Sequence, residues 1–246
     1  MIRSADEIKK MRRAGRVVAE MMEKTRQAIA PGVTTVELDR IAREVLERRS
    51  AKSNLLDYHG FPSVICTSPN SVVIHGIPGA YVLEEGDIIS VDCGAEIDGY
   101  HGDAAYTAPV GEISHLKKRL IAVTERSLWA GIDVMKEGRH LHEVGKVIQK
   151  IVESAGFFVV REYVGHGIGT QIHEEPDVPN YWPGSPGPVL KAGNVFAVEP
   201  MVIAGSSETV VARNGWSVVA SGGHPSAHFE HTVAITADGP EVLTVF

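Results

Sequence analysis

Several features that define other classes of protein are missing from this 246-residue sequence. It has only two cysteines, Cys66 and Cys93, which excludes a disulfide framework and favours the reducing cytoplasm. No stretch approaches the ~20 consecutive apolar residues of a membrane span. The N-terminal residues MIRSADEIKKMRR are charged and lack the apolar core of a signal peptide. The sequence therefore predicts a cytoplasmic protein that does not engage a membrane.

The sequence also lacks an excess of basic residues and most of the familiar catalytic motifs. Its formal net charge is −7, whereas surfaces that bind nucleic-acid phosphates are normally basic, so no nucleic-acid specificity is expected. There is no HExxH helix, no CxxC pair, no P-loop and no GxSxG motif. The sequence GHGIG lacks the spacing of a dinucleotide-binding GxGxxG loop.

Helices are predicted at corresponding places in the two halves of the chain. Ser4–Glu7 reads as a capping box that opens a first helix, which Pro31-Gly32 ends, and Thr34–Glu37 opens a second. The second half has a helical pattern at about 114–135, followed by apolar residues spaced as on one helix face over 144–152. Each half therefore reads as helix, helix and then strands.

A sequence repeat supports an internal duplication. The segment VLEEGDIISVD (82–92) matches VLKAGNVFAVE (189–199), 107 positions later, and both end in a carboxylate. We therefore expect one α+β domain over residues 1–246, with pseudo-repeats of about 1–110 and 111–246 related by a pseudo-twofold axis and sheets covered by helices. The strand-like residues 194–199 follow a proline-rich segment, 179–193, that is expected to form a loop.

Two aspartates in the first half are predicted to lie together. Asp98-Gly99 is typical of a two-residue hairpin turn. If Ile97 pairs with Tyr100, Asp92 lies opposite residue 105 and Asp103 lies opposite residue 94, which places both carboxylates on one face. Small residues opposite them leave room for an ion, although the same pattern also fits a surface hairpin whose acids face water.

The second half supplies equivalent carboxylates. Glu199 matches Asp92, and Glu230 occupies the strand position that corresponds to Asp103. Four carboxylates in one cleft would repel each other, and two divalent cations are the simplest remedy. A histidine ligand is also expected, and three histidines lie in glycine-rich stretches. Spacing alone does not decide among His75, His166 and His173.

The motifs HGIPG, VDCGAEIDGYHGD, GHGIGTQIHEEP, VEPM and FEHT together resemble those of the type I methionine aminopeptidases over nearly the whole chain. The resemblance implies the pita-bread fold and removal of the initiator methionine from nascent polypeptides whose second residue is small. Only 25 residues separate His173 from Glu199, which leaves no room for the helical subdomain of type II enzymes. No N-terminal extension precedes Ser4, as expected of a short bacterial or organellar form.

The resemblance also implies a dinuclear metal centre of Co, Mn, Fe or Zn ions. In that arrangement Asp92 binds one ion, Asp103 and Glu230 bridge both ions, and His166 and Glu199 complete the second. A water or hydroxide between the ions attacks the substrate, with Glu199 as the general base.

Further roles in the reaction follow from the same resemblance. His173 is expected to stabilise the oxyanion, and His75 to contact the scissile amide nitrogen. The pocket for the methionine side chain is expected to comprise Tyr58, Phe61, Cys66 and Trp216. The aromatic residues among these also fit an ordinary hydrophobic core.

Two positions depart from the pattern of the family. Ile172 stands before His173 where a larger, often aromatic residue is frequent, which bears on the shape of the pocket. His228 precedes Phe229-Glu230 where glutamine is common, which bears on hydrogen bonding around the metal ligands.

The expected partners are nascent polypeptides with an N-terminal methionine. Ribosome association is compatible with the resemblance, and a monomer is expected because nothing in the sequence requires a partner subunit. Three alternatives stay open: a related pita-bread X-Pro peptidase, a non-catalytic pita-bread binding protein, and a two-metal phosphoesterase. The first usually carries a large N-terminal domain, the second predicts missing ligands, and the third fits poorly with an aromatic pocket.

Overall fold

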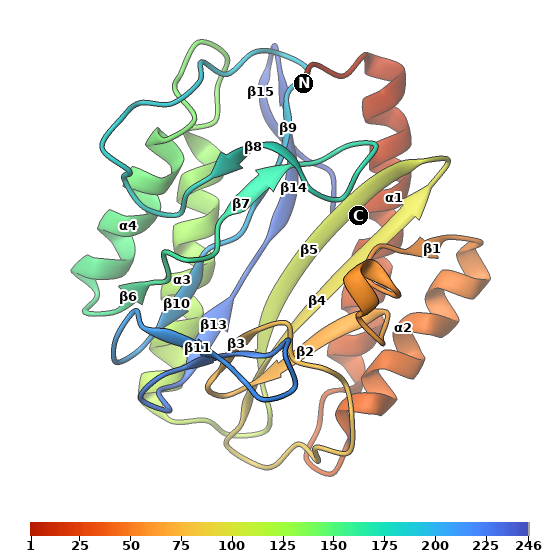
Figure 1. Ribbon diagram of the computed structural model, residues 1–246, viewed down its shortest axis with the longest axis vertical. Coiled ribbons are helices and arrows are strands. Elements are labelled where there is room, and N and C mark those ends of the chain that lie inside the picture. The colour runs from red at the N-terminus through yellow and green to blue at the C-terminus, as the bar shows by residue number, and fades with distance from the viewer. Residues whose placement is uncertain (246) are drawn as a thin grey trace.

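Two pairs of helices flank a set of antiparallel strands in the computed structural model, which describes residues 1–245 (Figure 1). Helices α1 (Ala5–Ala28) and α2 (Thr35–Arg49) form one pair, and α3 (His115–Asp133) and α4 (Glu143–Ser154) form the other. The four predicted helices are thus confirmed. Within residues 1–245, no helix is long and apolar enough to cross a membrane.

Both predicted helix starts have the hydrogen bonds of a capping box. The Ser4 side chain accepts from the backbone N–H of Glu7, and the Glu7 carboxylate accepts from the backbone N–H of Ser4. At α2, the Glu37 carboxylate accepts from the backbone N–H of Thr34 at 2.7 Å. These bonds satisfy donors that the first turn of a helix leaves free.

The strands pair antiparallel throughout and are short except for one long hairpin. In the first half they are β1 (Lys52–Ser53), β2 (Ile65–Pro69), β3 (Val72–Ile74), β4 (Ile88–Ile97) and β5 (Tyr100–Pro109), with a short 3-10 helix, η1 (Tyr58–Gly60). In the second half they are β6 (Phe158–Val159), β7 (Gly165–Gly167), β8 (Glu174–Val178), β9 (Val195–Val198), β10 (Met201–Ile203), β11 (Thr209–Val211), β12 (Val218–Ala220), β13 (Ser226–His228), β14 (His231–Thr236) and β15 (Gly239–Val242).

Two of the sheets position the site. In one, β4 pairs with β1, β2 and β5, and the other has the order β15-β14-β9-β7-β8. Two three-stranded sheets, β13-β10-β6 and β11-β12-β3, complete the layer between the helix pairs. Within residues 179–193, the predicted loop, the structure has only an isolated bridge from Val189 to His140.

The β4–β5 hairpin has the predicted register. Ile97 pairs with Tyr100, Asp92 with Ala105, and Gly94 with Asp103. The turn residues Asp98 and Gly99 have φ angles of 52° and 75°, and the two-residue type I′ turn requires positive φ at both positions. Asp92 and Asp103 are therefore diagonal neighbours on one face of the hairpin.

The two halves meet along β5 and the start of β14. Ala105 and Glu230 exchange backbone hydrogen bonds of 2.9 and 3.3 Å. The Thr232 hydroxyl accepts from the Asp103 backbone N–H and donates to the Asp103 carbonyl. One cluster of buried apolar side chains extends from Val17 to Ile235 and includes residues of both halves. The carboxylates of the two halves are thereby brought together.

A close approach of α1 to the segment that follows β15 gives a prediction for stability. A Cβ atom added at Gly15 would lie 2.1 Å from the Leu243 carbonyl oxygen. Alanine normally stabilises a helix by ~1 kcal/mol relative to glycine, but the overlap here forces the backbones apart. We expect Gly15→Ala to lower the free energy of unfolding by ~1–3 kcal/mol, measured by thermal or urea unfolding.

Glu125 on the exposed face of α3 provides the matched control. Glu125→Ala is expected to change the free energy of unfolding by less than ~0.5 kcal/mol. A Gly15→Ala variant as stable as the wild type would contradict the proposed close packing.

Candidate metal centre

One cavity of about 120 Å³ gathers the candidate site residues. It is small beside the ~300–1,000 Å³ of pockets for drug-sized ligands, and fits a single side chain. All eleven site residues proposed from the sequence line it, and Leu55 and Ile172 complete the wall. Those eleven are Tyr58, Phe61, Cys66, His75, Asp92, Asp103, His166, His173, Glu199, Trp216 and Glu230.

Four carboxylates reach the cavity from the ends or middles of strands. Asp92 lies on β4 and Asp103 on β5, Glu199 directly follows β9, and Glu230 directly precedes β14. The Asn180 side-chain amide donates to the backbone carbonyl of Glu199 at 3.1 Å, which fixes the chain where β9 ends. The buried, regular strands on both sides thus hold the acids close together.

The electrostatics of this group favour the binding of cations. Burial, with added repulsion among the acids, raises the pKa of Asp103, Glu199 and Glu230 well above the ordinary range. Burial raises the pKa of Asp92 to about 7. One buried oxygen on each of Asp92, Asp103 and Glu230 has no hydrogen-bond partner. Divalent cations would satisfy these oxygens and turn repulsion into coordination, so the donor set fits such ions.

His166 on β7 is prepared to donate a lone pair. Its Nδ1 lies 2.9 Å from the Gly167 carbonyl, which can only accept, so Nδ1 carries the proton and Nε2 is free. Burial lowers the pKa of His166 to about 3, which keeps the ring neutral. Its Nε2 lies 3.4 Å from Glu199 Oε1. This distance is close to the separation of two ligand atoms in a tetrahedral metal site with bonds of ~2.1 Å.

The donor atoms form two overlapping triads. One ligand atom each from Asp103, His166 and Glu230 lies within 4.8 Å of the others, and the same holds for Glu199, His228 and Glu230. Glu230 belongs to both triads, whereas Asp92 belongs to neither.

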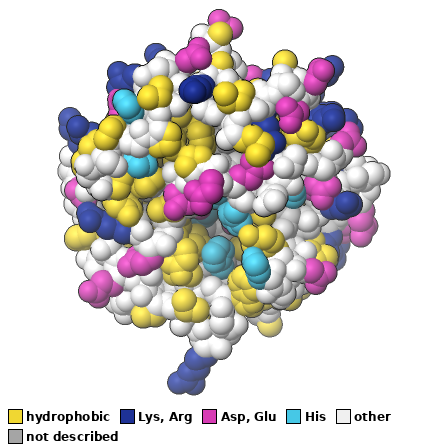
Figure 2. Space-filling view, turned by 45° about the horizontal axis from the view of Figure 1, so that its top comes forward, with side chains coloured by type: hydrophobic (Ala, Val, Ile, Leu, Met, Phe, Trp, Pro, Cys, Tyr) yellow, Lys and Arg dark blue, Asp and Glu magenta, His cyan; other side chains and the backbone are white. Residues whose placement is uncertain are grey.

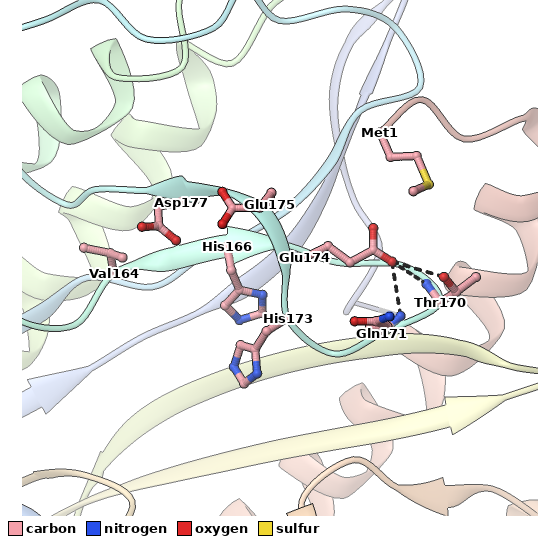
Figure 3. Close-up of a pocket in the computed structure, with 9 residues that line it drawn as sticks. All are labelled: Met1, Val164, His166, Thr170, Gln171, His173, Glu174, Glu175 and Asp177. Atoms are coloured by element: carbon pink, nitrogen blue, oxygen red, sulfur yellow. Dashed lines mark hydrogen bonds between the residues drawn. The ribbon is translucent and has the colours of Figure 1, made fainter.

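His173 lies beside His166, with 4.2 Å between the ring centroids. Figure 3 shows both rings pointing from the β7–β8 segment toward β4 and β5. Its Nδ1 is 2.7 Å from the Tyr58 hydroxyl. Burial lowers the pKa of His173 and raises that of Tyr58, so a neutral imidazole faces a protonated phenol.

A larger cavity of about 720 Å³ opens nearby, but its acids do not belong to the candidate metal centre. Glu175 and Asp177 point away from the two histidine rings, from the other side of β8 (Figure 3). Glu174 is engaged by the Arg3 guanidinium and by the backbone N–H of Thr170. On the face shown in Figure 2, histidine side chains gather near the middle, next to an acidic group.

His75 lies just after β3 with a φ of 57°, an uncommon left-handed conformation for a residue other than glycine. Burial and the nearby His173 lower its pKa to about 4, so the ring is uncharged at neutral pH. An uncharged ring that lines the cavity can exchange a hydrogen bond with a ligand there.

The rest of the cavity wall is apolar or aromatic. Phe61 and Trp216 meet edge to face, with 5.2 Å between ring centroids. Cys66 on β2 pairs with Asp92 across the sheet and is almost fully buried, and burial raises the pKa of its thiol. Ile172 is 5% exposed and contributes a branched aliphatic surface at the position where the family often carries a larger, aromatic residue.

Sequence reasoning missed Leu55, because nothing in its local pattern links it to the site. It also gave no definite position for His228, which the structure places with Nε2 3.7 Å from Glu199 Oε2. The unusual histidine before Phe229-Glu230 was the only indication of that contact.

Comparison with known proteins gives a consistent result. Residues 9–237 match the model of metallopeptidase family M24. A methionine aminopeptidase 1 of Bacillus subtilis is 49% identical over 95% of this chain and 94% of its own length. The crystal structure of methionine aminopeptidase from Thermotoga maritima superposes with a TM-score of 0.97 at 43% identity and covers all of both chains.

An X-Pro peptidase is more distant. The Xaa-Pro dipeptidase from Bacillus anthracis is 26% identical, with a TM-score of 0.78, and 99% of this chain matches only 61% of that one. The pita-bread fold is thus shared, but the similarity in sequence and length favours the methionine aminopeptidases. The chain therefore belongs to metallopeptidase family M24 and, within it, to the type I methionine aminopeptidases.

Proposed function

We propose that this chain removes the N-terminal methionine from peptides and nascent proteins whose second residue is small, in a reaction that depends on divalent metal ions. The observation that carries the proposal is one small cavity of about 120 Å³ that combines five metal-ligand side chains with an aromatic wall. The full-length relatives named methionine aminopeptidase support it.

The family implies a divalent metal, and we propose that this chain holds two ions. Asp92 would bind one, His166 and Glu199 the other, and Asp103 and Glu230 would bridge them. Mixed oxygen and imidazole donors accept Mn, Fe, Co or Zn. When bound, such ions lower the pKa of a water molecule and polarise the peptide carbonyl.

Glu199 is proposed as the general base. Its side chain is 13% exposed and lies at the edge of the cavity, where it can reach an attacking water. Burial raises its proton affinity, which suits a group that takes a proton from water and passes it to the departing nitrogen. Loss of the proton to that nitrogen completes cleavage of the amide bond.

Tyr58 and His173 are proposed to work as a pair. If the Tyr58 hydroxyl donates to His173 Nδ1, the imidazole carries its proton on Nε2. That N–H is then available to an oxyanion that develops on the substrate carbonyl. His75, whose neutral ring lines the same cavity, is proposed to contact the scissile amide nitrogen.

The apolar wall is proposed to select methionine. Phe61, Cys66 and Trp216 offer aromatic and sulfur surface to a flexible thioether, and S–aromatic contacts contribute ~0.3–1.5 kcal/mol each. Tyr58 also lines the pocket.

We further propose that residues 1–246 act as one catalytic domain in the cytoplasm. The shared apolar cluster from Val17 to Ile235 supports a single domain, and two unpaired, buried cysteines suit a reducing compartment. Ribosome association and a monomeric state remain predictions from the sequence.

A pair of peptides separates this function from its closest alternative. We expect metal-loaded protein to release free methionine from Met-Ala-Ser at least ~100-fold faster than it releases alanine from Ala-Pro-Ser, because only methionine fills the aromatic pocket. The amino acids released would be quantified by chromatography. Faster cleavage of the Ala-Pro bond would instead identify an X-Pro peptidase.

A further inference from the structure

His228 is held rigidly at the end of β13. Its backbone N–H donates to the Thr107 hydroxyl oxygen at 2.9 Å, and its carbonyl accepts from the same hydroxyl at 2.8 Å. On the other edge of its strand, His228 pairs with Met201 of β10. The residue is 2% exposed, so its side chain has little freedom to move.

The Nε2 atom of the His228 imidazole faces Glu199. Among residues 1–245, no hydrogen bond is made by its buried Nε2. That atom lies 3.7 Å from Glu199 Oε2, whereas Glu199 Oε1 lies 3.4 Å from His166 Nε2. The Glu199 carboxylate is therefore placed between two imidazoles, one at each oxygen.

The two oxygens of Glu199 have different surroundings. Oε1 faces the free lone pair of His166, which suits a metal ion between them. Oε2 faces His228 at a separation about 0.8 Å longer than a typical ~2.9 Å N–H···O bond. A buried polar nitrogen without a partner is unfavourable, so a small rotation of Glu199 that closes this gap is favourable when Nε2 carries the ring proton. Carboxylates that bind a metal are commonly hydrogen-bonded in turn by a neighbouring group.

We propose that His228 is a positioning residue that donates Nε2–H to Glu199 Oε2 and so orients this carboxylate toward the metal and the attacking water. The inference deepens the proposed function and rests on the role of Glu199 in it. It assigns no bond to the metal for His228, although Glu199, His228 and Glu230 offer donor atoms within 4.8 Å of one another.

Two substitutions test the role of the N–H group. His228→Gln keeps a side-chain N–H donor, and His228→Met removes it while keeping an apolar side chain of similar reach. Positioning groups of this kind typically contribute 10–100-fold to activity or metal affinity. For Met-Ala-Ser, we expect His228→Met to lower kcat ~10–100-fold with KM within ~3-fold, and His228→Gln to stay within ~3-fold of the wild type.

Binding of Co²⁺ gives a readout that does not depend on catalysis. Titration calorimetry and the visible absorption of the Co²⁺ complex would be compared across the variants. We expect His228→Gln to keep the wild-type spectrum and stoichiometry, and His228→Met to keep the stoichiometry with ~10–100-fold weaker binding. The exposed His224, substituted by glutamine, is the control and is expected to match the wild type in both measurements.

Distinct outcomes would overturn the proposal. Wild-type kcat and Co²⁺ affinity in a folded His228→Met protein would show that no positioning bond is made. Loss of one Co²⁺ equivalent and a changed spectrum in His228→Gln would show a direct ligand instead. If wild-type protein released no methionine, the proposed function would fail, but the Co²⁺ titrations would still decide whether His228 supports Glu199.

Discussion

Replacing Glu199 by glutamine is expected to lower kcat/KM for Met-Ala-Ser by ~10³-fold or more. Glutamine has nearly the same shape as glutamate but cannot accept the proton of an attacking water. It is also a weaker metal ligand than a carboxylate. Glu199 is placed for both proposed roles, metal ligand and general base. One of its oxygens faces His166, and its carboxylate lines the cavity.

The same variant is expected to stay folded. The Glu199 backbone is held by Asn180 and by the end of β9, and neither contact involves the carboxylate. Burial and neighbouring acids raise the pKa of this carboxyl, so its ionised form destabilises the metal-free fold near neutral pH. Metal-free Glu199→Gln should therefore unfold at a temperature equal to or above that of the metal-free wild type.

Metal analysis separates the two roles of Glu199. A Glu199→Gln protein that keeps two ions per chain but does not turn over has lost the base alone, and one that keeps a single ion has also lost a ligand. Glu175→Gln on β8 is the control, since that exposed carboxylate points away from the candidate metal centre. Near-normal activity of a folded Glu199→Gln protein would refute the assigned role.

The sequence predicted the β4–β5 hairpin and its register because that information is local. The Asp98-Gly99 turn fixes which residues pair, and the alternation of side chains then places Asp92 and Asp103 on one face. The duplication extended this reasoning to Glu199 and Glu230, and the structure brings all four carboxylates to one cavity.

Contacts between segments that lie far apart in the sequence could not be predicted from local patterns. Leu55 reaches the cavity because it lies just after β1, which pairs with β4, and no periodic pattern indicates this. The position of His228 depends on the pairing of β13 with β10, which are separated by the β11–β12 segment. The roles of individual histidines came from the family resemblance, because glycine-rich spacing alone did not distinguish them.

Removing the metal is expected to abolish methionine release, and a divalent first-row metal is expected to restore it. Two buried and two partly buried carboxylates, together with a free imidazole nitrogen, form a donor set that fits divalent cations. Protein treated with EDTA and then freed of the chelator should lose more than ~99% of its activity, since bound metal would supply the Lewis-acid chemistry of the proposed reaction. Unchanged activity in protein shown by elemental analysis to be metal-free would contradict the mechanism.

Stability should respond to the same ions in a manner that depends on pH. The pKa of Asp92 is raised to about 7 from an ordinary 3.8, and those of Asp103, Glu199 and Glu230 are also raised. Above pH ~4 these four carboxyls therefore hold more protons in the folded metal-free chain than in the unfolded chain. Their contribution to the free energy of unfolding consequently falls as the pH rises from ~4 through the raised pKa values.

Bound cations replace these protons, so metal should stabilise the protein more at pH 7.5 than at pH 5.5. With Mn²⁺ at one fixed concentration, about 100 times its Kd at pH 7.5, we expect a gain of ~2.7 kcal/mol at that pH, or about 5–10 °C in Tm for a chain of this size. Asp103→Asn should lose most of this gain, because Asp103 is a proposed bridging ligand. Asp177→Asn, on the exposed face of β8, should keep it. An equal gain at both pH values would show that the ions bind without displacing protons from the buried carboxylates.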